Sequence, residues 1–330
     1  MIEDARPAEV AHWLERERDV RARAIVPTVS WMRPVVLPVA ERLLHLDLRR
    51  RGVASRWLKT PHAALHAYDA RGKGPLPSTV FLHGIGSAAT PFAALLHQMR
   101  PHVRRIVAPD YPGHGRSHHP TRALTRPVLF ESVACALDEL LGDGEPAILV
   151  GNSLGGAVAL HYAIARPERV RALVLLSPAG APSSEPEWRE VRRAFEMSSA
   201  RDARAFLTRV YHRAPWFIPL FAHEFRSVMK RPAVRDLLES ATNDHLPARD
   251  SLRSLPMPIL LLWGKSERLL PESHFDYFVE HLPAHAVIER PDGFGHCPHF
   301  EAPRPLARRI LQFARSLPPF APLRDAAQTG

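Results

Sequence analysis

The stretch that decides the fold is ILVGNSLGGAVAL, residues 148–160. A run of Ile, Leu and Val leads into Gly-Asn-Ser-Leu-Gly, and small apolar residues that suit a helix follow. This is the G-x-S-x-G pattern in the strand-to-helix context that it requires. Glycines flank Ser153 because so tight a turn leaves no room for side chains. The turn lifts the serine Oγ above the strand end, at a helix N-terminus that favours developing negative charge. The alternative is a serine that only caps the helix.

Compact apolar runs alternate with helix-length segments on both sides of this stretch. Residues 53–60 and 63–70 suit a hairpin. Strands are predicted at 78–84, 103–110, 147–152, 171–177, 258–264 and 285–291, and helices at 8–24, 35–51, 91–100, 127–141, 154–166, 272–282 and 303–316. Continuous apolar strands that alternate with helices indicate a mostly parallel sheet with helices on both faces. The fold class is therefore α/β.

One long segment interrupts the alternation. Between 178 and 255 no strand-like run occurs, and the sequence is helical and rich in Arg. An insertion after a strand's carboxyl end lies over the face where parallel sheets bind ligands, so it is a candidate lid. Its apolar aromatic residues are candidate substrate-binding groups or packing groups: Trp216, Phe217 and Phe221. We expect an N-terminal helical extension at 1–52, a core at 53–177 and 256–318, a helical lid at 178–255 and a flexible tail at 319–330.

Composition limits the classes of partner. The chain has 330 residues and a net charge of +10, but its bases are interspersed with acids and no nucleic-acid-binding motif occurs. Two cysteines make neither a disulfide framework nor a metal site, so we expect no metal and no cofactor. No signal peptide or transmembrane stretch is evident, which favours a cytoplasmic protein. Residues 35–51 combine apolar side chains with arginines and suit peripheral contact with an anionic membrane, or packing on the core or another subunit. The sequence does not indicate an oligomeric state.

A nucleophilic serine needs a base, and the base needs an acid, in the chain order Ser, acid, His. His296 lies in the glycine-flanked loop of PDGFGHCPHFEAP (291–303) after the last strand, with His299 as its rival. Glu267 in PILLLWGKSERLLP (258–271) follows the preceding strand and can orient His296, with Asp292 as its rival.

An oxyanion hole is predicted from backbone amides. FLHGIGS (81–87) follows the first strong strand, and His83-Gly84 permits a close turn of the backbone. The N–H groups of Ile85 and Leu154 are the candidate donors to a tetrahedral oxyanion.

These motifs resemble those of the α/β-hydrolase superfamily over residues 53–316. The likeness rests on HG at 83–84, DYPGHGRS at 110–117, GNSLGG at 151–156, WGKSERLLP at 263–271 and GHCPHFEAP at 295–303. It implies that Ser153 is the nucleophile, that His296 is the base and that the amides of Ile85 and Leu154 form the oxyanion hole. The family usually has Asp where Glu267 stands, so this side chain must fold back. A serine at position 153 disfavours the haloalkane dehalogenase and epoxide hydrolase branches.

Two branches of the superfamily compete. C–C hydrolases of the meta-cleavage-product type commonly have Trp after the histidine and a GPG-type oxyanion loop, whereas this chain has Cys297 and GIGSAA. The pattern is similar to that of monoacylglycerol-lipase-like esterases. It therefore favours a serine hydrolase that cleaves a small apolar ester, either short-to-medium acyl or monoacylglycerol-like. A C–C hydrolase and a non-catalytic binding protein on the same fold are the alternatives.

Overall fold

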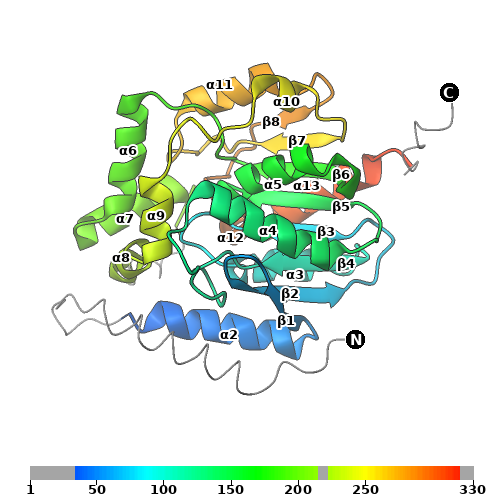
Figure 1. Ribbon diagram of the computed structural model, residues 1–330, viewed down its shortest axis with the longest axis horizontal. Helices are drawn as coiled ribbons and strands as arrows, with labels where there is room; N and C mark the ends of the chain where they lie inside the picture. The colour runs from blue at the N-terminus through cyan, green and yellow to red at the C-terminus, as the bar shows by residue number, and fades with distance from the viewer. Residues whose placement is uncertain (1–33, 215–221, 320–330) are drawn as a thin grey trace. The chain divides into compact units, whose positions relative to one another are not determined.

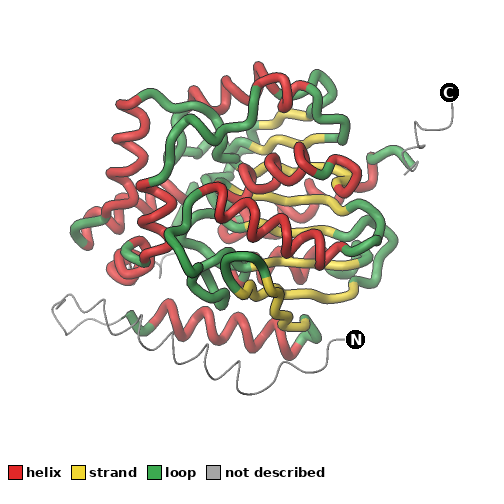
Figure 2. The backbone as a smooth tube through the Cα atoms, in the orientation of Figure 1, coloured by secondary structure: helices red, strands yellow, loops and turns green. Residues whose placement is uncertain are grey.

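The computed structural model describes residues 34–214 and 222–319, and these form an eight-stranded sheet in the order β1-β2-β4-β3-β5-β6-β7-β8 (Figures 1 and 2). β1 and β2 form the predicted antiparallel hairpin, β2 is antiparallel to β4, and every other neighbouring pair is parallel. The mostly parallel sheet is thus confirmed. The strands are β1 (Ala54–Lys59), β2 (Ala64–Arg71), β3 (Thr79–Leu82), β4 (Arg105–Pro109), β5 (Ala147–Asn152), β6 (Val170–Leu176), β7 (Ile259–Leu262) and β8 (Val287–Glu289).

Helices cover both faces of the sheet because its strands are apolar on both sides. Along β5, Leu149 packs into one hydrophobic cluster, whereas Ile148 and Val150 pack into the other, as the alternation of side chains along a strand requires. The first cluster includes α4 (Arg126–Leu141), α5 (Leu154–Ala165) and α11 (Glu272–His281). The second includes α3 (Ala93–Met99) and α13 (Pro303–Ser316). Short helices complete the core: η1 (Thr90–Phe92), η2 (Pro167–Arg169) and α12 (Pro298–Glu301).

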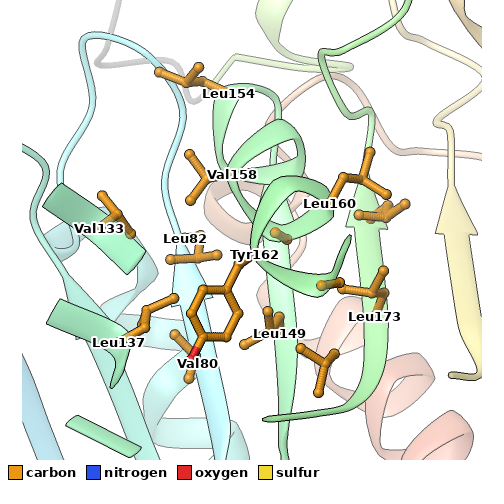
Figure 3. Close-up of a cluster of buried hydrophobic side chains, with 14 of the residues drawn as sticks. Val80, Leu82, Val133, Leu137, Leu149, Leu154, Val158, Leu160, Tyr162 and Leu173 are labelled. Atoms are coloured by element: carbon orange, nitrogen blue, oxygen red, sulfur yellow. The ribbon is translucent and has the colours of Figure 1, made fainter. Parts of the chain in front are cut away.

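The helix that begins within residues 148–160, α5, lies directly on the sheet. Figure 3 shows Tyr162 and Val158 of α5 beside Leu82 of β3 and Leu149 of β5, with Leu137 of α4 nearby. The Tyr162 hydroxyl donates to Asp138 Oδ1 at 2.9 Å, so the one polar atom of this ring is satisfied at the edge of the apolar layer. The central strands and α5 are therefore packed together in the core, which fixes the place of residues at their ends.

The segment between β6 and β7 contains no strand among its described residues, as predicted. It consists of α6 (Glu185–Glu196), α7 (Ala200–Val210), α8 (Ala222–Met229), α9 (Pro232–Glu239) and α10 (Arg249–Arg253). Phe195, Phe206, Leu207 and Val228 of these helices share a separate hydrophobic cluster. Trp216, Phe217 and Phe221 lie outside the described residues, as does the helix expected at 8–24.

The predicted helix at 35–51 is α2 (Val36–Arg50). Its first two amides, of Val36 and Leu37, donate to the carboxylate of Glu224 on α8 at 2.9 and 2.7 Å. Glu224 is buried, and its carboxyl group lies at the positive end of the helix dipole. This pair of bonds ties α2 to the insertion. No helix in the described ranges is long and apolar enough to span a membrane.

Candidate active site

Ser153 lies on a strained turn between β5 and α5. Its backbone has φ 54° and ψ −119°, a conformation that non-glycine residues rarely adopt and that costs about 1 to 3 kcal/mol. The glycines around it are required by close contacts. A Cβ on Gly155 would lie 2.0 Å from the Leu82 carbonyl oxygen, and one on Gly151 would lie 2.3 Å from the Gly155 carbonyl oxygen. The turn therefore presents the serine at the carboxyl end of the central strand.

His296 and Glu267 form a buried hydrogen-bonded pair. His296 Nδ1 donates to Glu267 Oε2 at 2.7 Å, and the two side chains are 4% and 2% exposed. The other oxygen, Oε1, accepts from the amides of Leu269 and Leu270 at 2.8 and 3.1 Å. The glutamate thus folds back onto its own loop, and both of its oxygens are used.

The charge state of Glu267 follows from these partners. Burial opposes ionisation, but the His296 ring, the Ser177 hydroxyl and the Leu270 amide together hold the pKa of the Glu267 carboxyl below its ordinary value. An ionised acid at this place keeps the proton of His296 on Nδ1 and leaves Nε2 free to accept one. Ser177 was not identified from the sequence. Its position directly after β6, next to β7 in the sheet, is the signal that could have found it.

Asn152 occupies the unspecified position before the serine in the G-x-S-x-G pattern. Its side chain holds the loop that carries His296, residues 291–297, called the histidine loop below. Its Nδ2 donates to the His296 carbonyl at 2.7 Å and to the Leu176 carbonyl at 3.1 Å. On the other side, the His296 amide donates to the Val210 carbonyl at the end of α7, at 2.8 Å. The loop is therefore held between the core and the insertion. Neither contact was predicted from the sequence, since both join segments that are distant in the chain.

Glu301 provides a second link between the histidine loop and the insertion. Its Oε1 accepts from the Gly295 amide at 2.6 Å and its Oε2 from the His212 amide at 2.7 Å. The His212 ring in turn contacts Ser266 Oγ at 2.6 Å, one residue before Glu267. Movement of the insertion would therefore disturb both the loop that carries His296 and the loop that carries Glu267.

The candidate oxyanion donors lie beside the serine. A Cβ on Gly84 would lie 3.4 Å from Ser153 Cβ, so the loop after β3 packs directly against the serine, and Ile85 follows that glycine. Leu154 is the first residue of α5, and the amides of a first helical turn have no partner within the helix. Both predicted donors are therefore placed next to Ser153.

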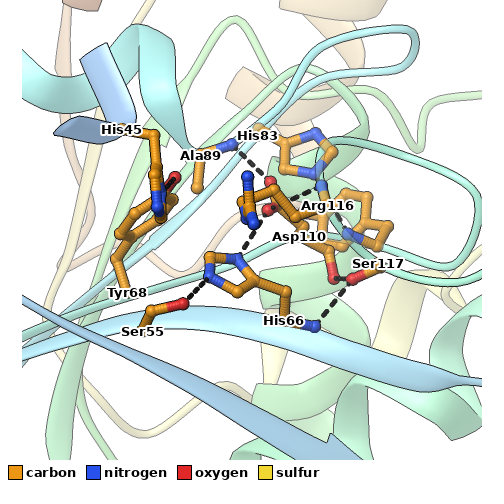
Figure 4. A network of polar contacts seen from close by, with 10 residues as sticks. His45, Ser55, His66, Tyr68, His83, Ala89, Asp110, Arg116 and Ser117 are labelled. Atoms are coloured by element: carbon orange, nitrogen blue, oxygen red, sulfur yellow. Dashed lines mark hydrogen bonds and ion pairs between the residues drawn. The ribbon is translucent and has the colours of Figure 1, made fainter. Parts of the chain in front are cut away.

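A buried polar network supports this loop from beneath (Figure 4). Asp110 accepts from the Ala89 amide at 2.8 Å through Oδ1 and contacts His66 Nδ1 at 2.9 Å through Oδ2. His66 Nε2 lies 2.7 Å from Ser55 Oγ. Ser55, His66 and Asp110 are thus aligned like a catalytic triad, but the carboxylate also accepts backbone amides and His66 is fully buried. Its role here is to position the loop that follows Ile85.

Neither rival residue takes part in the bond between His296 and Glu267, although His299 lines the same cavity as Ser153. Asp292 is exposed and pairs with Lys265 at 3.0 Å. His299 is buried with its ring 4.3 Å from that of Phe92, and burial lowers its pKa to about 3. Neither is placed like Glu267 or His296.

Ser153 and His296 line one cavity of about 260 Å³, whose walls are mostly apolar. The walls come from α2, from the insertion and from the histidine loop. Examples are Leu37, Leu44, Phe206, Val210, Met229 and Cys297. Burial, followed by the carboxylates of Glu267 and Glu301, raises the pKa of the Cys297 thiol, which therefore stays protonated. The cavity can take an apolar chain that ends at the serine.

Residues 79–309 match the model of the alpha/beta hydrolase family. The chain is 31% identical to a pimeloyl-[acyl-carrier protein] methyl ester esterase of Xanthomonas campestris over 271 residues, which cover 76% of this chain and 99% of that protein. It is 34% identical to a 2-hydroxymuconate semialdehyde hydrolase of a Pseudomonas species over 211 residues, 58% of this chain and 71% of that protein.

A solved structure shows the same fold. A carboxylesterase from Bacillus subtilis superposes with a TM-score of 0.66 at 21% identity, covering 83% of this chain and 98% of that one. The family match spans residues of both the core and the insertion.

Proposed function

This chain belongs to the alpha/beta hydrolase family, and we propose from that premise that it hydrolyses carboxylic esters through an acyl-enzyme on Ser153. The observation that carries the assignment of residues is the 2.7 Å bond between His296 and Glu267, in a chain whose Ser153 and His296 line one cavity. The relative with esterase activity in its name supports the choice of bond, since the match covers nearly all of that protein.

The reaction follows from the placement of these groups. Ser153 Oγ attacks the ester carbonyl carbon while His296 Nε2 takes its proton, and the carbonyl electron pair moves onto oxygen. The amides of Ile85 and Leu154 hold this oxyanion, each worth about 3 to 4 kcal/mol. The C–O bond then breaks, and the alcohol leaves with the proton from His296. Water attacks the acyl carbon in the same way, which releases the acid and restores Ser153.

The substrate is a small apolar ester, with an acyl group of short to medium length. The cavity of about 260 Å³ supports this choice, because neither Arg nor Lys is among its lining residues in the described part of the chain. We further propose that residues 178–255 act as a lid, because the amide of His296 and the start of α2 are both bonded to them.

Labelling tests the nucleophile. A fluorophosphonate should attach to Ser153, as located by mass spectrometry, and Ser153→Ala should lose both the label and ester turnover while it keeps the wild-type Tm. Attachment at another residue, or undiminished turnover in the variant, would reject the assignment.

We also propose that α2 contacts an anionic membrane surface. Val39, Leu43 and Leu46 recur at i, i+4 and i+7 on one face of the helix, and they are 51%, 61% and 39% exposed. Arg42 and Arg49 are exposed beside them and complement anionic lipid. The opposite face of the same helix lines the cavity of Ser153.

Vesicle flotation tests this contact. The protein should float with vesicles that contain anionic lipid and less so with pure phosphatidylcholine, and Leu43→Ser should weaken the binding. Flotation that ignores lipid charge, or none at all, would leave the apolar face to a protein partner.

A further inference from the structure

Three cavities meet in series around Ser153. The first, of about 260 Å³, shares Ile85, Ser153, Phe195 and Leu269 with a small cavity of about 80 Å³. It shares Glu41, Ala88 and Thr90 with a third cavity of about 620 Å³ beneath α2. Ser153 therefore lies between the cavity of about 80 Å³ and the cavity of about 260 Å³. On its other side, the cavity of about 260 Å³ continues into the third cavity, which is more polar.

The junction with the third cavity holds a buried hydroxyl that lacks a partner. Thr90 is 5% exposed, and its Oγ1 makes no hydrogen bond to any described residue. Leaving a buried polar group without a partner is unfavourable, so such an atom at a cavity wall points to a ligand that bonds to it. The Thr90 hydroxyl can donate one hydrogen bond and can also accept hydrogen bonds.

A carboxyl group lies at the same junction. Glu41 of α2 lines both cavities, and within the described ranges it takes part in no hydrogen bond or ion pair. Burial raises the pKa of Glu41, Arg231 lowers it and Asp110 raises it again. With its acceptor oxygens, the junction suits a group that donates hydrogen bonds.

Three other polar side chains of the third cavity, those of His45, Tyr68 and Asp110, already have hydrogen-bonding partners. Figure 4 shows His45 beside Tyr68. It also shows Asp110 surrounded by the groups that it contacts. His45 Nδ1 contacts the Tyr68 hydroxyl at 2.8 Å, and Asp110 accepts from two amides and contacts His66. Arg42 and Arg116 also line the third cavity, but among the residues that line both this cavity and the cavity of Ser153, the side chains that can form a further hydrogen bond are those of Thr90 and Glu41.

We propose that Thr90 and Glu41 form a subsite for an uncharged hydroxyl group of the ester, which the apolar cavity separates from the scissile bond. This inference rests on the proposed ester hydrolysis at Ser153. An uncharged hydroxyl can donate a hydrogen bond to the Glu41 carboxyl and accept one from Thr90, whereas a carboxylate end group has no proton to donate; Arg42 and Arg116 line the third cavity outside this junction. The natural substrate is then an apolar ester with a hydroxyl at one end, either on the acyl chain or on a polyol alcohol.

Matched substrates test the subsite. Methyl esters of straight-chain acids are compared with methyl esters of ω-hydroxy acids over a series of chain lengths. 1-Monoacylglycerols are compared with ethyl esters of the same acids. At the chain length that reaches the junction, the hydroxylated member of one pair should have about tenfold higher kcat/KM. The pair that shows the preference identifies the side of the ester that carries the hydroxyl. An ω-carboxylate methyl ester should show no such gain.

Variants assign the preference to the junction. Thr90→Val and Glu41→Leu should bring the ratio within each pair to about one, whatever their effect on the turnover of the plain ester. Asp47→Asn is the matched control, because this acid on the same helix pairs with Arg51 and His97 and lines none of the three cavities. It should keep the wild-type ratio.

The outcomes separate the subsite from the proposed reaction. Turnover of plain esters with no hydroxyl preference at any length, or a preference that both variants retain, would overturn the subsite alone. No ester turnover and no labelling of Ser153 would reject the reaction. Binding then still reports on the junction, because an α,ω-diol should raise the Tm more than the alkanol of equal length in wild type but not in Thr90→Val. Equal shifts would overturn the subsite.

Discussion

At the scale of single residues, the site depends on how the Glu267 side chain reaches His296 from a position where the family usually has the shorter aspartate. The extra methylene of Glu267 is taken up by a turn of its own loop, where Oε1 accepts the Leu269 and Leu270 amides. That anchoring leaves Oε2 directed at His296. The longer side chain is therefore held by two backbone bonds.

Substitution of Glu267 tests its role as the orienting acid. Glu267→Gln removes the charge that stabilises the imidazolium and lets the histidine take the wrong tautomer, so kcat should fall about a thousandfold or more. Glu267→Asp, which keeps the charge, should retain more activity than Gln. Steady-state kinetics and Tm measurements on both variants check this. Unchanged kcat in Glu267→Gln would move the role to another carboxylate, with Asp292 next.

The same carboxylate makes stability depend on pH. Because the folded protein lowers the pKa of Glu267 from 4.5, its ionised form stabilises the fold above that pH, and this contribution is lost as pH falls through the lower folded value. The difference in unfolding free energy between wild type and Glu267→Gln should therefore shrink as the pH falls below about 4.5. Urea unfolding across an acidic pH series measures it. A difference that grows on acidification would contradict the ionised state.

At the scale of elements, one helix has two faces with different tasks. The inner face of α2 includes Leu37 and Leu44, which line the cavity of Ser153, while Leu43 points outward and is 61% exposed. Glu224 of α8 fixes the start of this helix. The size of the cavity thus depends on α2 and the insertion together.

Filling the cavity from α2 should change the chain-length preference. Wild type should prefer butyrate or longer 4-nitrophenyl esters over acetate. Leu37→Trp should move that preference toward shorter chains, because the larger ring occupies acyl space. Leu43→Trp on the opposite face is the control and should leave the profile unchanged. If wild type hydrolysed esters of all chain lengths equally, or if the two variants had the same chain-length preference, this would contradict an apolar acyl cavity that is lined by α2.

At the scale of the whole molecule, the cavity system bears on which bond is cleaved. A C–C hydrolase must hold a dienoate carboxylate, which calls for an arginine near the serine. Among the described residues that line the two cavities at Ser153, the one arginine is Arg126. Its Nη1 donates to the Thr242 carbonyl at 2.6 Å and its guanidinium lies 5.7 Å from the Trp188 ring. The site is therefore better suited to a neutral ester.

A comparison of kcat/KM on a 4-nitrophenyl ester and a 2-hydroxy-6-oxo-dienoate decides between the two bonds. The ester should be cleaved readily and the dienoate little. Arg126→Gln should leave ester turnover within about threefold, since no charge on a neutral ester needs this arginine. A dienoate that is favoured by more than about a hundredfold, or about 2.7 kcal/mol in barrier height, would make this a C–C hydrolase.

Local sequence determined the elements and the identity of the candidate groups. The apolar period and the glycines of 148–160 predict a strand, a tight turn and a helix, and the structure has β5, Ser153 and α5 there. Helix and strand positions in the core agree within a few residues. The edge strand β8 is shorter than the predicted 285–291, because pairing on one side alone leaves its ends without partners.

Only the tertiary structure decided what surrounds those groups. The Asn152 amide reaches His296 across 144 residues, and Glu224 reaches Leu37 across 187. Helix α2 lines the cavity of Ser153 together with segments that are far away in the chain. The junction likewise brings Glu41 and Thr90 together. Hydrophobic period and turn chemistry report on neighbours within about one or two turns of chain. Contacts between distant segments depend on how the sheet and its insertion pack in space, and no local pattern encodes that.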